Sequence, residues 1–283
     1  MPDYSMFVPN VRFELIPIKD LVSNQEYQRN LSQSHVERTA ANFDLRQINP
    51  VKVSKRDGLN NVFDGQHTVD IVARASGSRD TPVWCMIYDE LSYQEEAHIF
   101  ANQKKYEKPL KPFEVFSAHI EAGNDKQLII KDLVESYSLS IGQVRNYNVI
   151  CAVSALERIY DKYGYHLLDR TLRLCVSAWE GDMYSLSGNF LNGVARLVHA
   201  FGDSLKDELF KERIGLISVK QLARTAKERR PGSLGYAEAM LMAYNRKCRY
   251  PLQWNKLYEK NLESNPEWDA NADLLEEDDI AEE

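Results

Sequence analysis

A short polar turn, Asp64-Gly65-Gln66-His67-Thr68, stands where an apolar strand ending at Phe63 gives way to helical apolar spacing that stops at Gly77. A strand that runs directly into a helix leaves the first helical N–H groups pointing outward, at the positive end of the helix dipole. Such an end favours a phosphate, and Gly65 allows close approach of the backbone to a ligand. We therefore expect a phosphate-bearing ligand at this turn. The alternative is that Asp64 only caps the helix.

Five sequence blocks occur in a fixed order before residue 108, and together they resemble a known family. They are Phe13-Glu14-Leu15-Ile16-Pro17-Ile18-Lys19-Asp20-Leu21, then Tyr27-Gln28-Arg29, a helical stretch over 34–43, Asn49-Pro50-Val51-Lys52-Val53, and Asp64-Gly65-Gln66-His67. The segment 13–108 resembles the N-terminal domain of ParB-like proteins, within the ParB/sulfiredoxin superfamily. The helical remainder resembles the C-terminal half of ParB-domain proteins from phages and other mobile elements.

The resemblance implies that the turn contacts the phosphates of a nucleotide. Thr68 stands where the family's turn carries an arginine, whose planar fork would neutralise phosphate charge. We expect Arg29 to supply the missing charge, and Arg74 is the alternative. Sulfiredoxins carry a reactive cysteine at the place of Gln66, and an amide offers no thiolate, so sulfinic acid reduction is excluded.

The function that the resemblance implies is that of a DNA-associated protein of a phage or mobile element, with a nucleoside triphosphate and Mg²⁺ as candidate ligands. A first alternative is a ParB-like nuclease or nucleotide hydrolase that uses Asp64 and His67 as catalytic groups. A second alternative is a non-catalytic interaction module whose site has decayed, with Thr68 as the trace of that loss. Asp44, Asp64 and Asp70 show no spacing suited to a metal, so no metal ligands are predicted.

The order of strand and helix patterns predicts an α+β protein. Residues 10–104 alternate strands and helices and are expected to form a small mixed-sheet domain, with a turn at Asp57 and Gly58 and a helix over 66–76. Capping boxes are expected at Ser34 with Glu37 and at Ser92 with Glu95. Residues 105–112 form a predicted linker, 113–262 a helical domain, and 263–283 an acidic tail expected to be disordered.

Two features of the helical part favour DNA as a partner. Residues 128–150 form a candidate helix-turn-helix, and its second helix would present Gln143, Arg145 and Asn146 to base edges. Lys220 and Arg224 belong to a basic stretch that would contact phosphates. The alternative for each is an ordinary helix pair or a solvated charged face.

The charge of the chain is divided unevenly. The formal net charge is −7, yet the tail 263–283 holds ten acidic side chains and no basic one. Residues 1–262 therefore carry 35 basic and 32 acidic side chains, a weakly basic balance compatible with nucleic acid. Four widely spaced cysteines, no long apolar run and no secretory leader lead us to expect a cytoplasmic protein without a membrane span.

Overall fold

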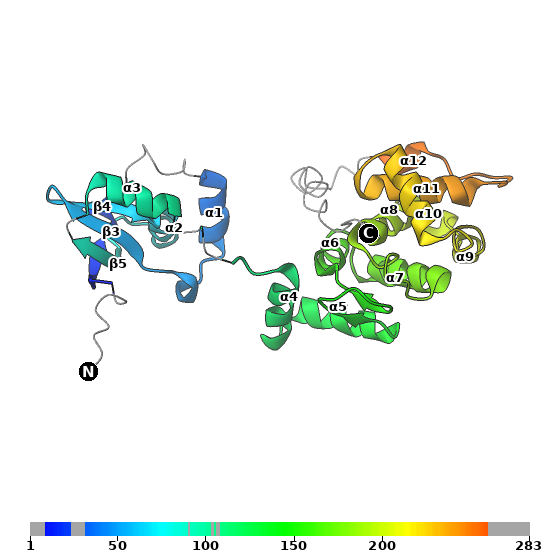
Figure 1. Ribbon diagram of the computed structural model, residues 1–283, viewed down its shortest axis with the longest axis horizontal. Helices are drawn as coiled ribbons and strands as arrows, with labels where there is room; N and C mark the ends of the chain where they lie inside the picture. Colours follow the sequence, from blue (N-terminus) through cyan, green and yellow to red (C-terminus); the bar gives the residue numbers. More distant parts are fainter. Residues whose placement is uncertain (1–8, 24–31, 90, 103–104, 106–107, 260–283) are drawn as a thin grey trace. The chain divides into compact units, whose positions relative to one another are not determined.

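The computed structural model describes residues 9–23, 32–89, 91–102, 105 and 108–259. The chain divides into two compact units, Met1–Pro109 and Leu110–Glu283 (Figure 1). The first holds a five-stranded mixed sheet with helices, and the second is built mainly of helices. The predicted α+β class, a small mixed-sheet domain followed by a helical one, is confirmed. In the described ranges, no helix has the length and apolar character needed to cross a bilayer.

The sheet of the first unit has the strand order β1-β5-β3-β4-β2. β1 is antiparallel to β5, β5 is parallel to β3, β3 is antiparallel to β4, and β4 is parallel to β2. The strands span Val11–Pro17 (β1), Leu21–Ser23 (β2), Val51–Arg56 (β3), Leu59–Asp64 (β4) and Pro82–Asp89 (β5). The turn predicted at Asp57 and Gly58 joins β3 to β4, with φ of 56° and 75° at these two residues.

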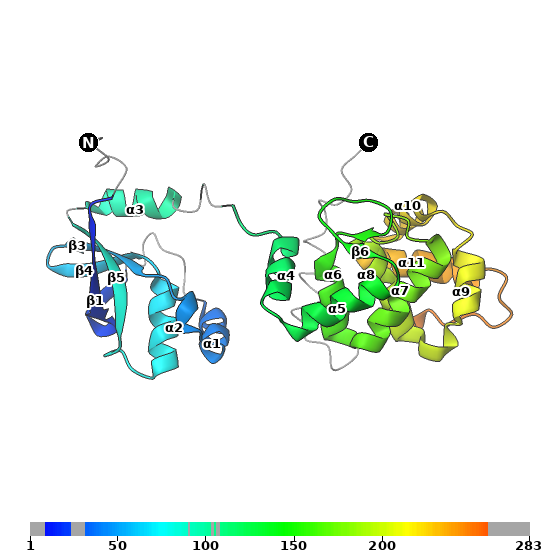
Figure 2. The ribbon, with the colours of Figure 1, turned by 90° about the horizontal axis from the view of Figure 1, so that it is seen from below.

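Helices cover the two faces of this sheet, and Figure 2 shows α2 and α3 on opposite sides of it. The helices are α1 (Gln33–Ala41), α2 (Gln66–Ser76) and α3 (Tyr93–Asn102). Val69 and Val72 of α2 pack on buried Val53 and Val62 of the sheet. The periodic apolar spacing of α2 creates this face, and the predicted bounds of that helix agree with the structure.

The two predicted capping boxes have different outcomes. Before α3, the Ser92 N–H donates to Glu95 Oε2 at 2.8 Å and the Glu95 N–H donates to Ser92 Oγ at 3.3 Å, which confirms that box. The box at Ser34 is wrong, because the N-cap of α1 lies two residues earlier. Its N-cap is Ser32, whose Oγ accepts a bond from the His35 N–H at 3.4 Å.

The second unit packs its helices around one large apolar core. Its central helices, α8 and α11, are buried on nearly every side, and Gly193 of α8 lets Tyr236 of α11 approach closely. The helices span Pro112–Glu121 (α4), Asp125–Ser136 (α5), Val153–Tyr163 (α6), Tyr165–Trp179 (α7), Gly188–Phe201 (α8), Asp207–Ile214 (α9), Val219–Arg229 (α10), Gly232–Asn245 (α11) and Asn255–Tyr258 (α12).

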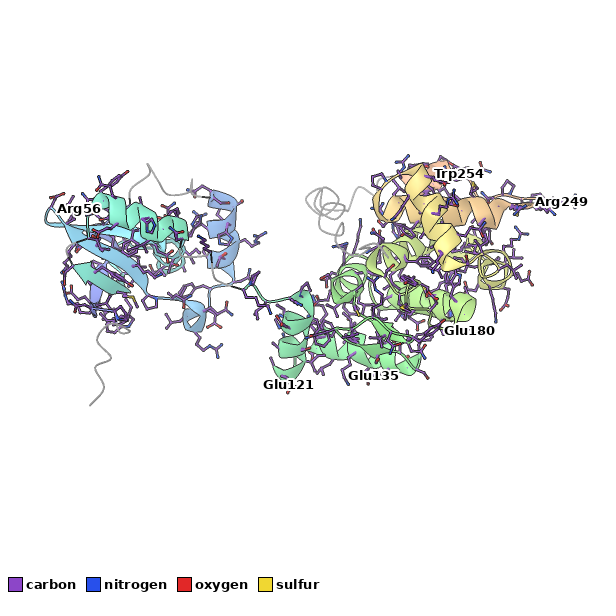
Figure 3. The ribbon with its side chains drawn as sticks, viewed as in Figure 1. Arg56, Glu121, Glu135, Glu180, Arg249 and Trp254 are labelled. Carbon is purple, nitrogen blue, oxygen red and sulfur yellow. The ribbon has the colours of Figure 1, made fainter. Side chains whose placement is uncertain are left out.

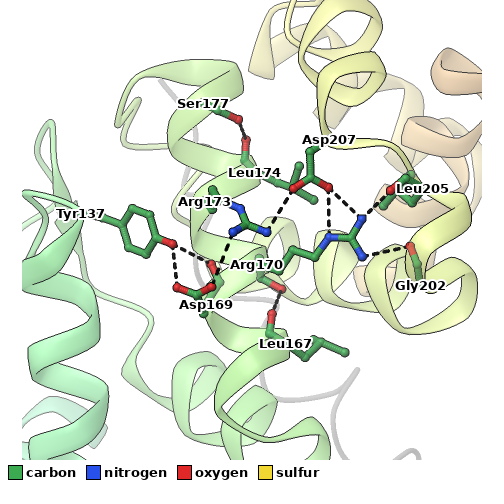
Figure 4. A network of polar contacts seen from close by, with 11 residues as sticks. Tyr137, Leu167, Asp169, Arg170, Arg173, Leu174, Ser177, Gly202, Leu205 and Asp207 are labelled. Carbon is green, nitrogen blue, oxygen red and sulfur yellow. Dashed lines mark hydrogen bonds and ion pairs between the residues drawn. The ribbon is translucent and has the colours of Figure 1, made fainter.

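A polar network joins three parts of this core (Figure 4). The guanidinium of Arg170 on α7 donates to Asp207 Oδ1 of α9 at 3.0 Å and to the carbonyl oxygen of Gly202 at 2.9 Å. It also donates to the carbonyl oxygen of Leu205. The orphan carbonyl groups that follow α8 are thereby satisfied by a side chain.

The candidate helix-turn-helix at 128–150 is wrong. α5 forms its expected first helix, but the second helix is absent. In its place stand two short parallel strands, β6 (Ser140–Ile141) and β7 (Val149–Ile150), joined by a turn. Asn148 has a left-handed φ of 59°, and its N–H donates to the carbonyl oxygen of Gly181 at 2.9 Å. This tertiary bond overrides the apolar spacing that suggested a helix.

Candidate phosphate-binding site

The turn predicted to bind phosphate lies between β4 and α2. Gly65 is the N-cap residue of α2 and has a left-handed φ of 96°, which only glycine adopts at low cost. A Cβ at this position would lie 3.3 Å from the Val51 Cα. Because glycine has no side chain, α2 begins without a side-chain cap. No side-chain oxygen of the N-cap residue therefore offsets the positive dipole end of α2.

α1 brings a second helix N-terminus to the same place. The Ser32 N–H, at the N-cap of α1, lies 3.4 Å from His67 Nε2 in the first turn of α2. Near the other end of α2, Arg74 forms an ion pair with Glu37 of α1 at 3.0 Å. The N-terminus of α1 therefore lies beside the first turn of α2. Two positive dipole ends that lie near each other strengthen the local preference for an anion.

Two histidines meet at this end. The rings of His35 and His67 have centroids 5.7 Å apart and an edge-to-face interplanar angle of 72°. His35 comes from α1, some thirty residues before His67. No periodic signal along the chain points to His35, because only the packing of α1 on α2 places it at the turn.

A lysine from β3 also reaches the turn. Lys52 Nζ lies 3.3 Å from Asp64 Oδ2, and both side chains are about one-third exposed, at 32% and 36%. The pair exists because β3 and β4 shift register between Lys52 and Val53, which puts Lys52 opposite Asp64. Lys52 was not predicted as a site residue, and it adds a cation beside Asp64 at the start of the turn.

The predicted residues of the turn differ in their exposure to solvent. Gln66 is buried, whereas Asp64, His67 and Thr68 are partly exposed. Arg29 lies outside the described residues. Arg74, the alternative source of charge, is engaged with Glu37 at the far end of α2 and does not reach the turn.

The carboxylates considered for catalysis are separated. Asp70 pairs with Arg79 at 3.4 Å, and Asp44 pairs with Arg46 at 3.1 Å. Within the described ranges, no group of three or more histidine, cysteine, aspartate or glutamate side chains could hold a metal ion. A Mg²⁺ ion that arrived with a triphosphate would have Asp64 as a nearby carboxylate, and it would compete with Lys52 for that group.

The residues predicted to contact DNA lie on separate elements of the second unit. Gln143 and Asn146 are exposed in the turn between β6 and β7, and the Arg145 guanidinium lies 5.9 Å from the centroid of the Tyr184 ring. Lys220 and Arg224 are exposed on α10, where Arg224 pairs with Glu228 at 3.0 Å. None of these residues occupies a recognition helix of the predicted kind.

Two further arginines of the basic stretch have a structural role. Arg229 and Arg230 each place Nε 2.8 Å from a different oxygen of Glu238, whose side chain is only 3% exposed. The Tyr258 hydroxyl donates to the same carboxylate at 2.8 Å. Arg229 also stacks on Trp254, which Figure 3 labels above α11. These contacts tie α10, α11 and α12 together.

The fold and site define a two-unit protein with an anion-favouring strand–turn–helix in a mixed-sheet domain. The chain belongs to a family of unknown function (DUF6551), whose model matches residues 22–253. No curated protein matches the chain in sequence.

Two solved structures of the C-terminally truncated chromosome-partitioning protein ParB from Caulobacter crescentus are similar to the chain. The one complexed with CTP-γ-S has a TM-score of 0.34 and 15% identity, and covers 83% of this chain and 98% of that one. The one complexed to the centromeric parS site has a TM-score of 0.25 and 14% identity, and covers 83% and 100%. These TM-scores are too low for a shared overall fold to follow from them.

Proposed function

We propose that the turn Asp64–Thr68 binds the phosphates of a nucleotide, and that the protein acts as a ParB-like, DNA-associated protein of a phage or mobile element. The observation that carries the nucleotide site is the uncapped N-terminus of α2 at Gly65, with the N-terminus of α1 beside its first turn. Lys52 beside Asp64, and the neighbouring rings of His35 and His67, add groups that can bind a phosphate. The DNA association and the biological setting follow from the resemblance of the sequence blocks.

The test of this site is the replacement of His67 by alanine. We expect nucleoside triphosphates to raise the melting temperature of the natural protein, because ligand that binds the native state stabilises it. His67→Ala should weaken binding about 10- to 100-fold, the range of one hydrogen bond to a charged group. The measurement is a thermal-shift titration with each nucleotide, with and without Mg²⁺.

His98→Ala is the matched control, since His98 is exposed on α3 of the same unit. It should leave the titration unchanged. Equal shifts in the natural protein and the His67→Ala variant would place any nucleotide site elsewhere.

A gain of affinity is expected from Thr68→Arg. Thr68 lies in the first turn of α2, where a guanidinium would point toward a phosphate held at the helix N-terminus. A charge-assisted hydrogen bond of this kind contributes about 1–3 kcal/mol. Calorimetric titration with the nucleotide that gives the largest thermal shift measures the change. An unchanged affinity would show that Lys52 or Arg29 already supplies the charge, or that the site has decayed.

Removal of residues 263–283 tests the proposed DNA association. The tail carries ten acidic side chains, whereas residues 1–262 are weakly basic, so a tethered anionic segment would compete with DNA for exposed cations such as Lys220 and Lys227. We expect the truncated chain to bind DNA more tightly than the full chain at low salt. The difference should shrink as salt rises, because screening and counterion release weaken both contacts.

The experiment is a salt titration of fluorescently labelled DNA with both chains. Equal affinities at every salt concentration would mean that the tail does not cover the DNA-binding surface. Absence of DNA binding by either chain would contradict the DNA association itself, whatever the outcome of the nucleotide titrations.

A further inference from the structure

Among the described residues, β1 is an edge strand with no strand on its outer side, and apolar side chains on its face are exposed. It is the terminal strand in the order β1-β5-β3-β4-β2, and Figure 2 shows it beside β5 at the margin of the sheet. Phe13 and Leu15 of β1 are 51% and 53% exposed, and the neighbouring Trp84 of β5, opposite Leu15, is 55% exposed. An exposed edge with apolar side chains is a template for pairing with another strand, and proteins usually protect such edges with charges or prolines.

The hydrogen-bond alternation shows which backbone groups face this edge. The Ile18 N–H donates to the Thr81 carbonyl at 3.1 Å, in the same register as the β1–β5 pairs. Bonded and non-bonded pairs alternate along an antiparallel ladder, so the even-numbered residues of β1 bond to β5. Phe13 and Leu15 therefore direct their N–H and C=O groups toward the open edge. Pro17, which lacks an N–H, ends the edge.

The side chains of this edge are self-complementary. Arg12 and Glu14 flank Phe13 and carry opposite charges. In an antiparallel pair of two β1 strands centred on Phe13, Arg12 of each copy lies opposite Glu14 of the other. Phe13 then faces Phe13 of the second copy, and Leu15 faces Val11. A pair centred on Glu14 would instead place two like charges opposite each other, which is destabilising.

We propose that two copies of this chain associate through antiparallel pairing of their β1 strands about a twofold axis at Phe13. In this register the N–H groups of Phe13 reach the Phe13 carbonyls of the other copy, and those of Leu15 reach Val11. The Val11 N–H is bonded to the Pro9 carbonyl at 3.0 Å and must exchange that partner to reach the Leu15 carbonyl of the other copy. The contact is isologous and closed, and it joins two five-stranded sheets into one.

Charge reversal tests this pairing. Arg12→Glu and Glu14→Arg each convert both cross-strand pairs from attractive to repulsive, so each variant should self-associate at least about tenfold more weakly than the natural chain. An equimolar mixture of the two variants places glutamates opposite arginines at every pair and should restore association. Sedimentation velocity over a range of concentrations gives the dissociation constants.

The mixture of the two variants distinguishes lost pairing from a folding defect. Arg12 also pairs with Glu14 of its own strand at 2.7 Å and bonds to Asp89, and Glu14 pairs with Lys55 at 3.0 Å. Each single variant could therefore lose stability. A misfolded chain would not regain association on mixing with another. A natural chain that is monomeric at all concentrations, or a mixture that stays monomeric, would overturn the proposal.

A cross-link tests the register independently. Phe13→Cys places two thiols at the axis with Cα atoms about 5.5 Å apart, which suits a disulfide. We expect a disulfide-linked dimer after mild oxidation. Leu59→Cys is the matched control, because Leu59 is 50% exposed on β4 of the same sheet. Equal cross-linking of the two variants, or none above that of the natural chain with its own four cysteines, would refute the Phe13-centred pair.

Discussion

Simultaneous replacement of Arg229 and Arg230 by alanine is expected to lower the free energy of unfolding of the helical unit by about 3–5 kcal/mol, the cost of leaving a buried charge uncompensated. Glu238 is 3% exposed, and both arginines hold its carboxylate at 2.8 Å. After the replacement, only the Tyr258 hydroxyl remains from this set of partners. Each single variant should cost less, because the other arginine stays in place.

Urea denaturation of the full chain, followed by the fluorescence of Trp254 and the other tryptophans, measures the loss. The control is Arg224→Ala with Lys227→Ala on the exposed face of the same helix, which should change stability by less than about 0.5 kcal/mol. Adding Glu238→Met to the double variant should recover much of the loss, since no buried charge then remains. A double variant as stable as the natural chain would return both arginines to the set of candidate DNA contacts.

Gly65→Val is expected to destabilise the first unit by about 2–5 kcal/mol, which combines the left-handed backbone cost with overpacking. Gly65 has a φ of 96°, and its Cβ would lie 3.3 Å from the Val51 Cα and 3.4 Å from both Val51 methyl groups. Loss of nucleotide binding in this variant would therefore report a damaged fold as well as a blocked site. For this reason, His67 is the better position for testing the ligand.

Gly58 separates the two contributions. It also has a left-handed φ, of 75°, but a Cβ there would meet nothing within 4 Å. Gly58→Val should lose only the stability that the left-handed backbone conformation costs a valine. Thermal denaturation of both variants measures the difference in stability between them. If Gly65→Val proved no worse than Gly58→Val, the contact with Val51 would contribute nothing to the requirement for glycine.

Turns and helices whose conformation is set by residues close together in the chain could be predicted from the sequence. Asp57 and Gly58 predicted the hairpin turn, and the apolar spacing up to Gly77 predicted α2 with its observed bounds. Local backbone preferences and periodic burial decide such features, and both can be read along the chain. The same reasoning predicted a helix after residue 142 and was wrong, because the bond from Asn148 to Gly181 comes from a distant turn.

The side chains that meet at the candidate site are brought together by contacts between separate segments. A regular hairpin from the Asp57–Gly58 turn would place Lys52 opposite Phe63, and a one-residue register shift places it opposite Asp64 instead. Packing of α1 on α2 brings His35 and Ser32 to His67, and the fold directs Arg229 and Arg230 to Glu238. Each of these pairings depends on register and helix packing between separate segments. The charged and polar residues can be read from the sequence, but their partners depend on the packing of the whole chain.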